Sequence, residues 1–391
     1  MRYNFDKVID RSGTSAEKVE GLKHIWGRTD LIPLWVADMD FATAPFVTDA
    51  IRKRCENEVL GYTGKPDSYY NAIINWVKQR YDLVVAKEMI NFVPGIVPGI
   101  GMAMNCFTQK GDKVMIQPPV YHPFAWVTTR NERTLVTNPL KWENGMYRMD
   151  LDTFREQIKG CKLFILCNPH NPGGVVWTEA ELRAIADICY DEKVLVFSDE
   201  IHADLTLPPH THRPFATVSE KARMNSVTFM SPSKAFNMPG LSASHALIFN
   251  EDLRKRFRIY MDAGELDMGH VFAFLSVEAA YSHGTEWLDQ CLAYIQGNID
   301  FVDDFLKNHA PKIKAIRPGA SYLVWLDCRE LELSQKDLNE FFVDKAHLAL
   351  NDGEMFGKEG IGFMRLNVAS PRCIIEKAMK QLADAYQLYI K

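Results

Sequence analysis

Short apolar runs alternate with stretches of helical periodicity between residues 89 and 250. Six of these runs are predicted strands: Met89–Val93, Val114–Gln117, Leu163–Cys167, Val194–Ser198, Val227–Met230 and Ala246–Phe249. Strands that are apolar on both faces and are separated by helices are typical of a mostly parallel sheet with helices on both sides. The pattern therefore predicts a large α/β domain.

Two helices are predicted before this sheet. Thr43 and Pro45 suit the start of a helix that runs from Phe46 to about Val59. A second helix begins near Pro66 and carries four apolar residues on one face: Tyr69, Ile73, Trp76 and Val77. Residues 1–45 show no such periodicity and are expected to be irregular.

The pattern changes after about residue 285, where a long helix is predicted from Thr285 to about Asn308. It is followed by a strand, a helix, a strand and a helix, at Ser321–Leu326, Ser334–Ala346, Phe363–Val368 and Pro371–Tyr389. This order indicates a smaller α+β domain. We expect an N-terminal segment (1–45) that packs with the small domain, a large domain (46–284) and a small C-terminal domain (285–391).

Composition narrows the possible partners. With 391 residues and 47% hydrophobic content, the chain is long enough for two domains. Its net charge of −5 argues against a nucleic-acid-binding protein, which usually has a basic excess. The N-terminus lacks an apolar signal core, and no run approaches the roughly 20 residues of a membrane span. We therefore expect a cytoplasmic protein.

The eight cysteines form no CxxC pair, and several lie inside apolar runs. Such cysteines are typical of free thiols in a reducing compartment. We expect neither a disulfide framework nor a metal site.

Two candidate residues follow predicted strands directly. Ligands of parallel α/β sheets gather beyond the carboxyl ends of the strands. Asp199 ends one strand, either as a turn carboxylate or as a buried carboxylate that faces a cation. Lys234 follows another strand, and a desolvated lysine suits Schiff-base chemistry, although most lysines are solvated surface charges. Ser231 and Ser233 form a simple turn or donate hydroxyls to a phosphate.

Four further segments carry polar chemistry. The glycine-rich turn in 92–101 opens a helix, and helix N-termini bind anions, but it matches neither a P-loop nor a dinucleotide fingerprint. Asn171, in the loop 168–174, either rigidifies that loop or faces a polar ring substituent. Tyr121 either packs in the core or stacks on a planar ligand. Arg365, inside an apolar strand, makes an internal salt bridge or binds a carboxylate.

The order of these segments resembles that of the fold-type-I pyridoxal 5′-phosphate (PLP) enzymes, the aspartate-aminotransferase superfamily. The resemblance covers nearly the whole chain. Within that superfamily the chain is similar to the MalY/PatB-type cystathionine β-lyases, which are carbon–sulfur lyases. Five segments carry this narrower similarity: Leu34–Phe41, Gly61–Gly64, Asn168–Gly174, Ser198–Leu205 and Ser231–Asn237.

The resemblance implies a role for each candidate. Lys234 would hold PLP as a Schiff base, Asp199 would pair with the ring nitrogen, and Arg365 would bind the substrate α-carboxylate. The other implied cofactor contacts are Asn171 and His202 at the phenolic oxygen, Tyr121 on the ring, and Ser231, Ser233, Ile96 and Val97 at the phosphate. His202 stands where many aminotransferases have a tyrosine.

Two features of the resemblance concern the phosphate. Tyr62 would reach the phosphate of a neighbouring subunit, which implies a homodimer with shared active sites. Many aminotransferases also place an arginine about eight residues after the lysine, on the phosphate. Here Leu241–Ala243 occupies that stretch, so hydroxyls and backbone would carry more of the phosphate binding.

The implied function is α,β-elimination from cystathionine or related cysteine S-conjugates, which gives pyruvate, ammonia and a thiol. Lys234 would take the Cα proton, and Tyr121 would support proton transfer to the leaving sulfur. A PLP-dependent class I/II aminotransferase is the first alternative. A PLP-binding regulatory protein with vestigial activity is the second, although such a protein has no need of Lys234, Asp199 and Arg365 together.

Overall fold

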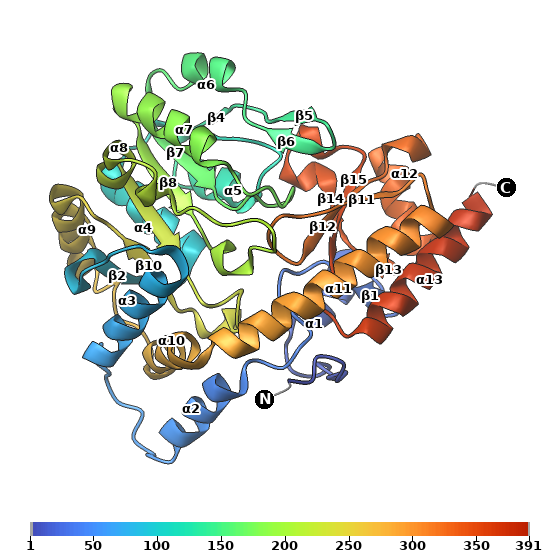
Figure 1. Cartoon of the computed structure of the whole chain (residues 1–391), viewed down its shortest axis with the longest axis horizontal. Coiled ribbons are helices and arrows are strands. Elements are labelled where there is room, and N and C mark those ends of the chain that lie inside the picture. The colour runs from blue at the N-terminus through green and yellow to red at the C-terminus, as the bar shows by residue number, and fades with distance from the viewer. Residues whose placement is uncertain (1–2, 390–391) are drawn as a thin grey trace.

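A seven-stranded sheet forms the centre of the large domain in the computed structural model, which describes residues 3–389 (Figure 1). Its strand order is β2-β10-β9-β8-β7-β3-β4. The bounds are β2 Ile90–Val93, β3 Lys113–Ile116, β4 Thr134–Thr137, β7 Cys161–Cys167, β8 Leu195–Asp199, β9 Ser226–Met230 and β10 Ser244–Leu247. Only β10 runs antiparallel to its neighbours in this sheet. The predicted mostly parallel sheet is confirmed.

Helices cover both faces of this sheet because its strands are apolar on both sides. Along β7, Leu163 and Ile165 pack into one hydrophobic cluster, whereas Phe164 and Leu166 pack into another on the opposite face. Successive side chains of a strand point to opposite faces, which explains the division. The helices of this domain are α2 Pro45–Cys55, α3 Asp67–Tyr81, α4 Ile96–Phe107, α5 Pro123–Arg130, α6 Leu151–Gln157, α7 Glu179–Asp191, α8 Glu220–Met224, α9 Glu251–Ala263 and α10 Val271–His283.

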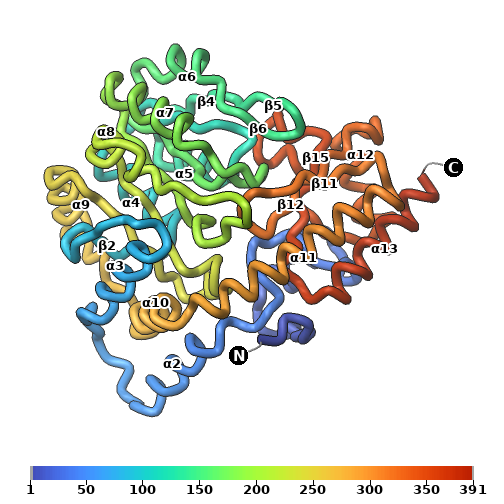
Figure 2. Tube along the Cα trace, viewed as in Figure 1, coloured from blue at the N-terminus to red at the C-terminus, as the bar shows by residue number. Residues whose placement is uncertain are grey.

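A second, four-stranded antiparallel sheet lies in the C-terminal part of the chain, in the order β11-β12-β15-β14. The strands are β11 Lys314–Ile316, β12 Leu323–Asp327, β14 Asn351–Asp352 and β15 Phe363–Asn367. The helices α11 Thr285–His309, α12 Gln335–Glu340 and α13 Arg372–Tyr389 accompany it. Figure 2 shows α11 as the long rod that leads from the large domain to this part of the chain.

The N-terminal segment lies against the C-terminal part. Its strand β1 (Ile32–Pro33) pairs in parallel with β13 (Leu348–Ala349). The large domain also carries a hairpin of β5 (Lys141–Glu143) and β6 (Met146–Arg148). We keep the predicted division at residues 45/46 and 284/285 as a proposal. No helix among residues 3–389 is both long enough and apolar enough to cross a membrane.

Two local predictions were wrong. Residues 1–45 are not wholly irregular, because helix α1 spans Glu17–Trp26; its buried face includes Lys18 and Gly21, which hid the apolar periodicity. Helix α2 ends at Cys55, and beyond it Val59 is 72% exposed, so no packing extends the helix to that residue. The predicted helix 334–346 is present, as α12 followed directly by a π-helical turn at Phe341–Lys345.

Candidate active site

A cavity lies at the carboxyl ends of β7 and β8, where ligands bind in parallel α/β sheets. The start of α4, the end of β7, the end of β8 and the loop after β9 all supply lining residues. Of the residues predicted from the sequence, eight line it: Ile96, Val97, Tyr121, Asn171, Asp199, His202, Ser233 and Lys234. Most of the predicted site is therefore brought together.

Lys234 projects into this cavity and donates a hydrogen bond to the carbonyl oxygen of Ala37 at 2.5 Å. Burial lowers the pKa of its ammonium to about 8, an effect that Arg365 reinforces and that Asp38 and Asp199 oppose. A lysine with this pKa keeps an appreciable unprotonated fraction near neutral pH. Its amine can then act as a nucleophile or accept a proton.

Asp199 is 3% exposed and accepts a hydrogen bond from the backbone N–H of Ile201 at 3.1 Å. It makes no ion pair with any residue in the described part of the chain. Burial raises the pKa of its carboxyl to about 7. A cation bound in the cavity would reverse that shift, because an opposite charge favours the ionised carboxylate.

His202 is buried beside these groups, and its Nδ1 atom has no hydrogen-bond partner. Burial, with help from the charges of Lys234 and Arg365, lowers the pKa of the imidazole to about 3. The ring is therefore neutral at physiological pH. A neutral imidazole with an unpartnered nitrogen is suited to a hydrogen bond with a polar ligand atom.

Arg365 is 3% exposed and stands on β15, behind the cavity wall. Its Nη1 donates to Asn171 Oδ1 at 3.1 Å, and its Nη2 donates to the carbonyl of Trp35 at 3.0 Å and to Asn351 Oδ1. All three acceptors are neutral, and its Nε has no partner. The internal salt bridge that the sequence left open does not exist among residues 3–389.

The buried charge of Arg365 therefore lacks a counterion. Burial accordingly lowers the pKa of the guanidinium to about 10. A buried charge is unfavourable unless it is paired, so this site favours an anionic ligand. A carboxylate matches the forked geometry of arginine.

The opposite end of the cavity is suited to a phosphate. Gly95 caps α4 with φ 141° and ψ 160°, a conformation that essentially only glycine adopts. The first backbone N–H groups of α4, at Ile96 and Val97, have no partner within the helix and so offer an anion site beside the cavity. Ser242 lines this wall where many aminotransferases carry an arginine, so the departure seen in the sequence is present in the structure.

Ser231 lies outside the cavity wall. Its hydroxyl contacts Ser233 Oγ and the carbonyl of Ala243, both at 2.8 Å, and accepts from the N–H of Ser233. Ser231 thus supports Ser233, which does line the cavity. Its predicted phosphate contact stays a prediction.

Tyr62 is the one predicted site residue that lies far from the cavity of its own chain. It is 98% exposed, in the segment between α2 and α3, which projects from the body of the molecule (Figure 1). Its predicted contact with a phosphate therefore requires a second copy of the chain.

The cavity fits PLP by the chemistry of its donors. It combines a lysine amine, a buried carboxyl without a cation, an imidazole with an unpartnered nitrogen and a helix N-terminus. These groups match, in order, the aldehyde, the ring nitrogen, the phenolic oxygen and the phosphate of the cofactor. Tyr121 lines the same cavity and supplies an aromatic face.

Several contacts of this site were not predicted. Ala37 and Trp35 offer backbone carbonyls to Lys234 and Arg365, and Tyr322 donates to the Ala37 carbonyl at 2.9 Å. The two backbone contacts lie inside a segment that the resemblance had already singled out, 34–41. Asn351 has no comparable signal in the sequence, because only the fold brings it to Arg365.

Known proteins are similar to this chain over almost its whole length. The sequence matches the aminotransferase class I and II family over residues 29–382. It is 38% identical to cystathionine β-lyase PatB of Bacillus subtilis, over 98% of this chain and 99% of that protein. It is 31% identical to protein MalY of Escherichia coli, over 98% of both chains.

A solved structure is also closely similar. Cystalysin from Treponema denticola, whose crystal structure contains a pyridoxal 5′-phosphate cofactor, superposes with a TM-score of 0.96 and 33% identity. The match covers 100% of both chains. The predicted fold type is therefore confirmed.

Proposed function

Since this chain belongs to the aminotransferase class I and II family, we propose that it is a PLP-dependent carbon–sulfur β-lyase. It cleaves cystathionine or related cysteine S-conjugates to pyruvate, ammonia and a thiol. Its full-length relatives at 31% to 38% identity include a cystathionine β-lyase, PatB, and MalY. The observation that carries the assignment is Arg365, a buried guanidinium held by three neutral oxygens beside the cavity of Lys234 and Asp199.

Nine residues would hold the cofactor. Lys234 would bind it covalently, Asp199 would face the ring nitrogen, and Asn171 and His202 would meet the phenolic oxygen. Tyr121 would cover the ring, while Ser231, Ser233 and the N–H groups of Ile96 and Val97 would hold the phosphate. When bound, PLP acts as an electron sink for the charge that proton removal leaves on the amino acid.

Arg365 orients the substrate. Two parallel N–H donors fix a carboxylate in position as well as in charge, so the Cα–H bond of the bound amino acid takes a defined direction. Asn171 Oδ1 and Asn351 Oδ1 hold the guanidinium in place from one side. The arginine thus selects α-amino acids and presents the Cα proton.

Lys234 moves that proton. Its lowered pKa, about 8, provides an unprotonated amine that accepts the Cα proton at Nζ. Asp199 keeps the ring nitrogen protonated, because a carboxylate beside a cation favours the charged form of both. Tyr121 lines the same cavity and supports proton transfer to the leaving sulfur.

A product assay tests this function. The purified protein, supplied with PLP and cystathionine or an S-alkyl cysteine, is expected to release pyruvate and free thiol without a keto-acid acceptor. Strict dependence on 2-oxoglutarate would identify an aminotransferase instead. Lys234→Ala should abolish turnover, and full activity of that variant would overturn the assignment of the lysine.

We also propose a homodimer with shared active sites, in the cytoplasm. The projecting segment between α2 and α3 exposes Val59, Leu60 and Tyr62, at 72%, 59% and 98%. Apolar side chains exposed together on one segment favour contact with another chain. The cytoplasmic location is supported by the cysteines, all of which are free thiols.

A further inference from the structure

One backbone segment touches both Lys234 and Arg365. We call residues 35–41 the strap. Its Ala37 carbonyl accepts hydrogen bonds from Lys234 Nζ at 2.5 Å and from the hydroxyl of Tyr322 at 2.9 Å. Its Trp35 carbonyl accepts from Arg365 Nη2 at 3.0 Å. The position of the strap therefore affects both groups of the proposed site.

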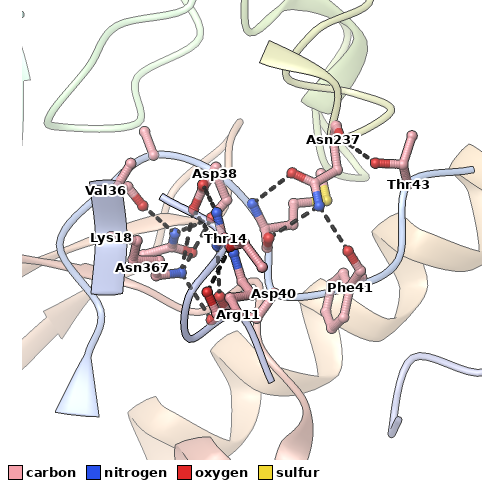
Figure 3. A network of polar contacts seen from close by, with 12 residues as sticks. Arg11, Thr14, Lys18, Val36, Asp38, Asp40, Phe41, Thr43, Asn237 and Asn367 are labelled. Carbon is pink, nitrogen blue, oxygen red and sulfur yellow. Dashed lines mark hydrogen bonds and ion pairs between the residues drawn. The ribbon is translucent and has the colours of Figure 1, made fainter. Parts of the chain in front are cut away.

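Two asparagines fasten the strap (Figure 3). Asn237 accepts from the N–H of Met39 at 3.0 Å and donates to the carbonyls of Met39 and Phe41 at 3.0 and 2.7 Å. Asn367 donates to the carbonyls of Val36 and Asp38 at 2.6 and 2.7 Å. Asn237 follows Lys234, and Asn367 follows Arg365, within three residues. The strap is thus tied to both chain segments that carry the site.

A partly buried charge network lies beside the strap (Figure 3). The side chain of Lys18, on α1, is 0% exposed; its Nζ lies 2.8 Å from Asp40 Oδ2 and 3.6 Å from Asp38 Oδ1. Arg11 pairs with Asp38 at 2.6 Å and with Asp40 at 3.3 Å. Two cations thus balance two carboxylates that both belong to the strap.

This network is an unusual choice if its only task is packing. The side chain of Lys18 is fully buried, whereas those of Asp38 and Asp40 are 12% and 21% exposed. An ion pair with a buried partner loses much of its Coulombic attraction to desolvation, and apolar residues of similar volume often stabilise as well. Lysine is almost never fully buried unless it is paired. Unlike apolar packing, these charges fix the strap in one position. Lys18 holds the two strap carboxylates, and its Nζ also donates to the Asp38 carbonyl at 3.3 Å.

We propose that Lys18 is a positioning residue of the active site, which holds the strap so that the Ala37 and Trp35 carbonyls meet Lys234 and Arg365. The proposal rests on the proposed function only for the roles of those two residues. Lys18 touches neither the cavity nor the reacting groups, and it acts through Asp38 and Asp40.

The charges around Lys234 determine whether a displaced strap raises or lowers the pKa of this lysine. Asp38 and Asp199 stabilise its protonated form, whereas burial and Arg365 oppose it. His202 also faces Lys234, and Tyr322 shares the Ala37 carbonyl with it. If the strap moves away, Lys234 loses a carbonyl acceptor and the nearby charge of Asp38, so its protonated form becomes less stable. Removing a cation without moving the strap would have the opposite effect.

The test compares Lys18→Met with Lys23→Met, which removes the same charge from an exposed position of the same helix. In the cofactor-free protein, hydrogen exchange of the strap amides, including Met39, is measured by mass spectrometry. In the PLP-loaded protein, the visible absorbance of the Schiff base at Lys234 is titrated with pH. Steady-state kcat and KM are then measured with an S-alkyl cysteine.

For Lys18→Met we expect faster exchange confined to the strap, a lower pKa of the Schiff base, and a loss of kcat/KM of about 10²-fold, the typical cost of misplacing a group by about 1 Å. Lys23→Met should match the wild type. An unchanged or raised pKa in a folded Lys18→Met protein would overturn the proposal. If that variant does not fold, Asp40→Asn removes the charge nearest to Lys18, and wild-type titration and exchange in that protein would overturn it equally.

Failure of the proposed function gives a different result. Exchange and titration require only that PLP binds at Lys234, not that the protein is a lyase. If the wild-type protein binds PLP but releases no pyruvate, the lyase assignment is refuted. Exchange and titration still test the role of Lys18 in that case. If the wild type is an active lyase and Lys18→Met has unchanged exchange and titration, only the proposed role of Lys18 is refuted.

Discussion

Arg365 is a buried cation whose hydrogen-bond partners in the described chain are all neutral. Replacing it by leucine should raise KM and lower kcat/KM by about 30-fold or more, because truncating one partner of a buried charge pair costs about 2–5 kcal/mol. The visible spectrum of bound PLP should stay the same without substrate. Steady-state kinetics with an S-alkyl cysteine and an absorbance scan check both expectations.

Arg254→Leu is the matched control for that experiment. The Arg254 guanidinium also binds only neutral oxygens, the carbonyls of Ile248 and Phe249, but it does not line the cavity. Its replacement should leave KM unchanged. Equal losses in both variants would show that Arg365 acts on stability and not on the substrate.

Asp199 gives a second residue-scale prediction, on stability and pH. Burial raises the pKa of its carboxyl from an ordinary 3.8 to about 7, so between these values the folded protein without cofactor binds a proton that the unfolded chain does not. Stability then falls as pH rises through this window and stays lower above it. Asp199→Asn mimics the protonated form and avoids that loss.

In the absence of PLP, Asp199→Asn should therefore raise Tm above that of the wild type, and by more at pH about 8 than at pH about 5. Thermal unfolding of both cofactor-free proteins at the two pH values measures this. With PLP present the order should reverse, because the wild-type carboxylate gains a cationic partner. The same difference at both pH values would contradict the assigned pKa shift.

Some residues of the site could be predicted from the sequence, and others could not. Asp199 and Lys234 follow apolar runs directly, so sheet geometry alone places them at one edge. For Arg365 the sequence left a salt bridge and a ligand role equally open. Its neutral partners in the described chain exclude the salt bridge, and the ligand role stays a proposal. Asn351 and Tyr322 reach the site through tertiary packing, which no local pattern encodes.

At the scale of elements, the start of α4 controls the proposed phosphate site. Gly95 has φ 141°, and a Cβ there would lie 3.3 Å from Pro98 Cδ. Gly95→Ala should weaken PLP binding about tenfold, because backbone strain of this kind costs about 1–3 kcal/mol and would displace the first N–H groups of the helix. Equilibrium titration of the cofactor-free protein with PLP gives the dissociation constant.

Gly111→Ala is the control that separates the effect of backbone strain on stability from its effect on the geometry of the phosphate site. Gly111 also has a positive φ, of 84°, but a Cβ there would meet nothing within 4 Å, and it lies outside the cavity wall. This variant should lose a similar amount of stability and keep the affinity for PLP. Weakened PLP binding in both variants would mean that the effect is global.

Elements were predictable where one physical signal dominates. Six of the seven strands of the large sheet were predicted to within two residues because they are apolar on both faces. The edge strand β4 (Thr134–Thr137) was missed because its residues are exposed or half-buried and form no apolar run. Helix α1 was missed because its buried face holds Lys18 and Gly21 and its N-cap, Ala16, offers no side-chain hydrogen bond. Lys18, which interrupts the apolar periodicity of this helix, is also the lysine that pairs with Asp38 and Asp40 of the strap.

At the scale of the whole molecule, the proposed contact of Tyr62 with a phosphate would need a second chain. It is 98% exposed on a projecting segment, whereas the cavity lies at the carboxyl edge of the large sheet. In a two-fold symmetric dimer each chain gives the same surface to its partner, so two projecting segments would complete two cavities. Each site would then contain Lys234 from one chain and Tyr62 from the other.

This arrangement predicts complementation between two inactive variants. Tyr62→Ala and Lys234→Ala should each be nearly inactive alone. After subunit exchange, a hybrid dimer has one site with both defects and one site with neither, so an equal mixture should recover up to about a quarter of wild-type activity. Differently tagged chains, purified in tandem, isolate the hybrid and prove that exchange has occurred. A purified hybrid without activity would refute the shared site, because without sharing each of its two sites would carry one of the two defects.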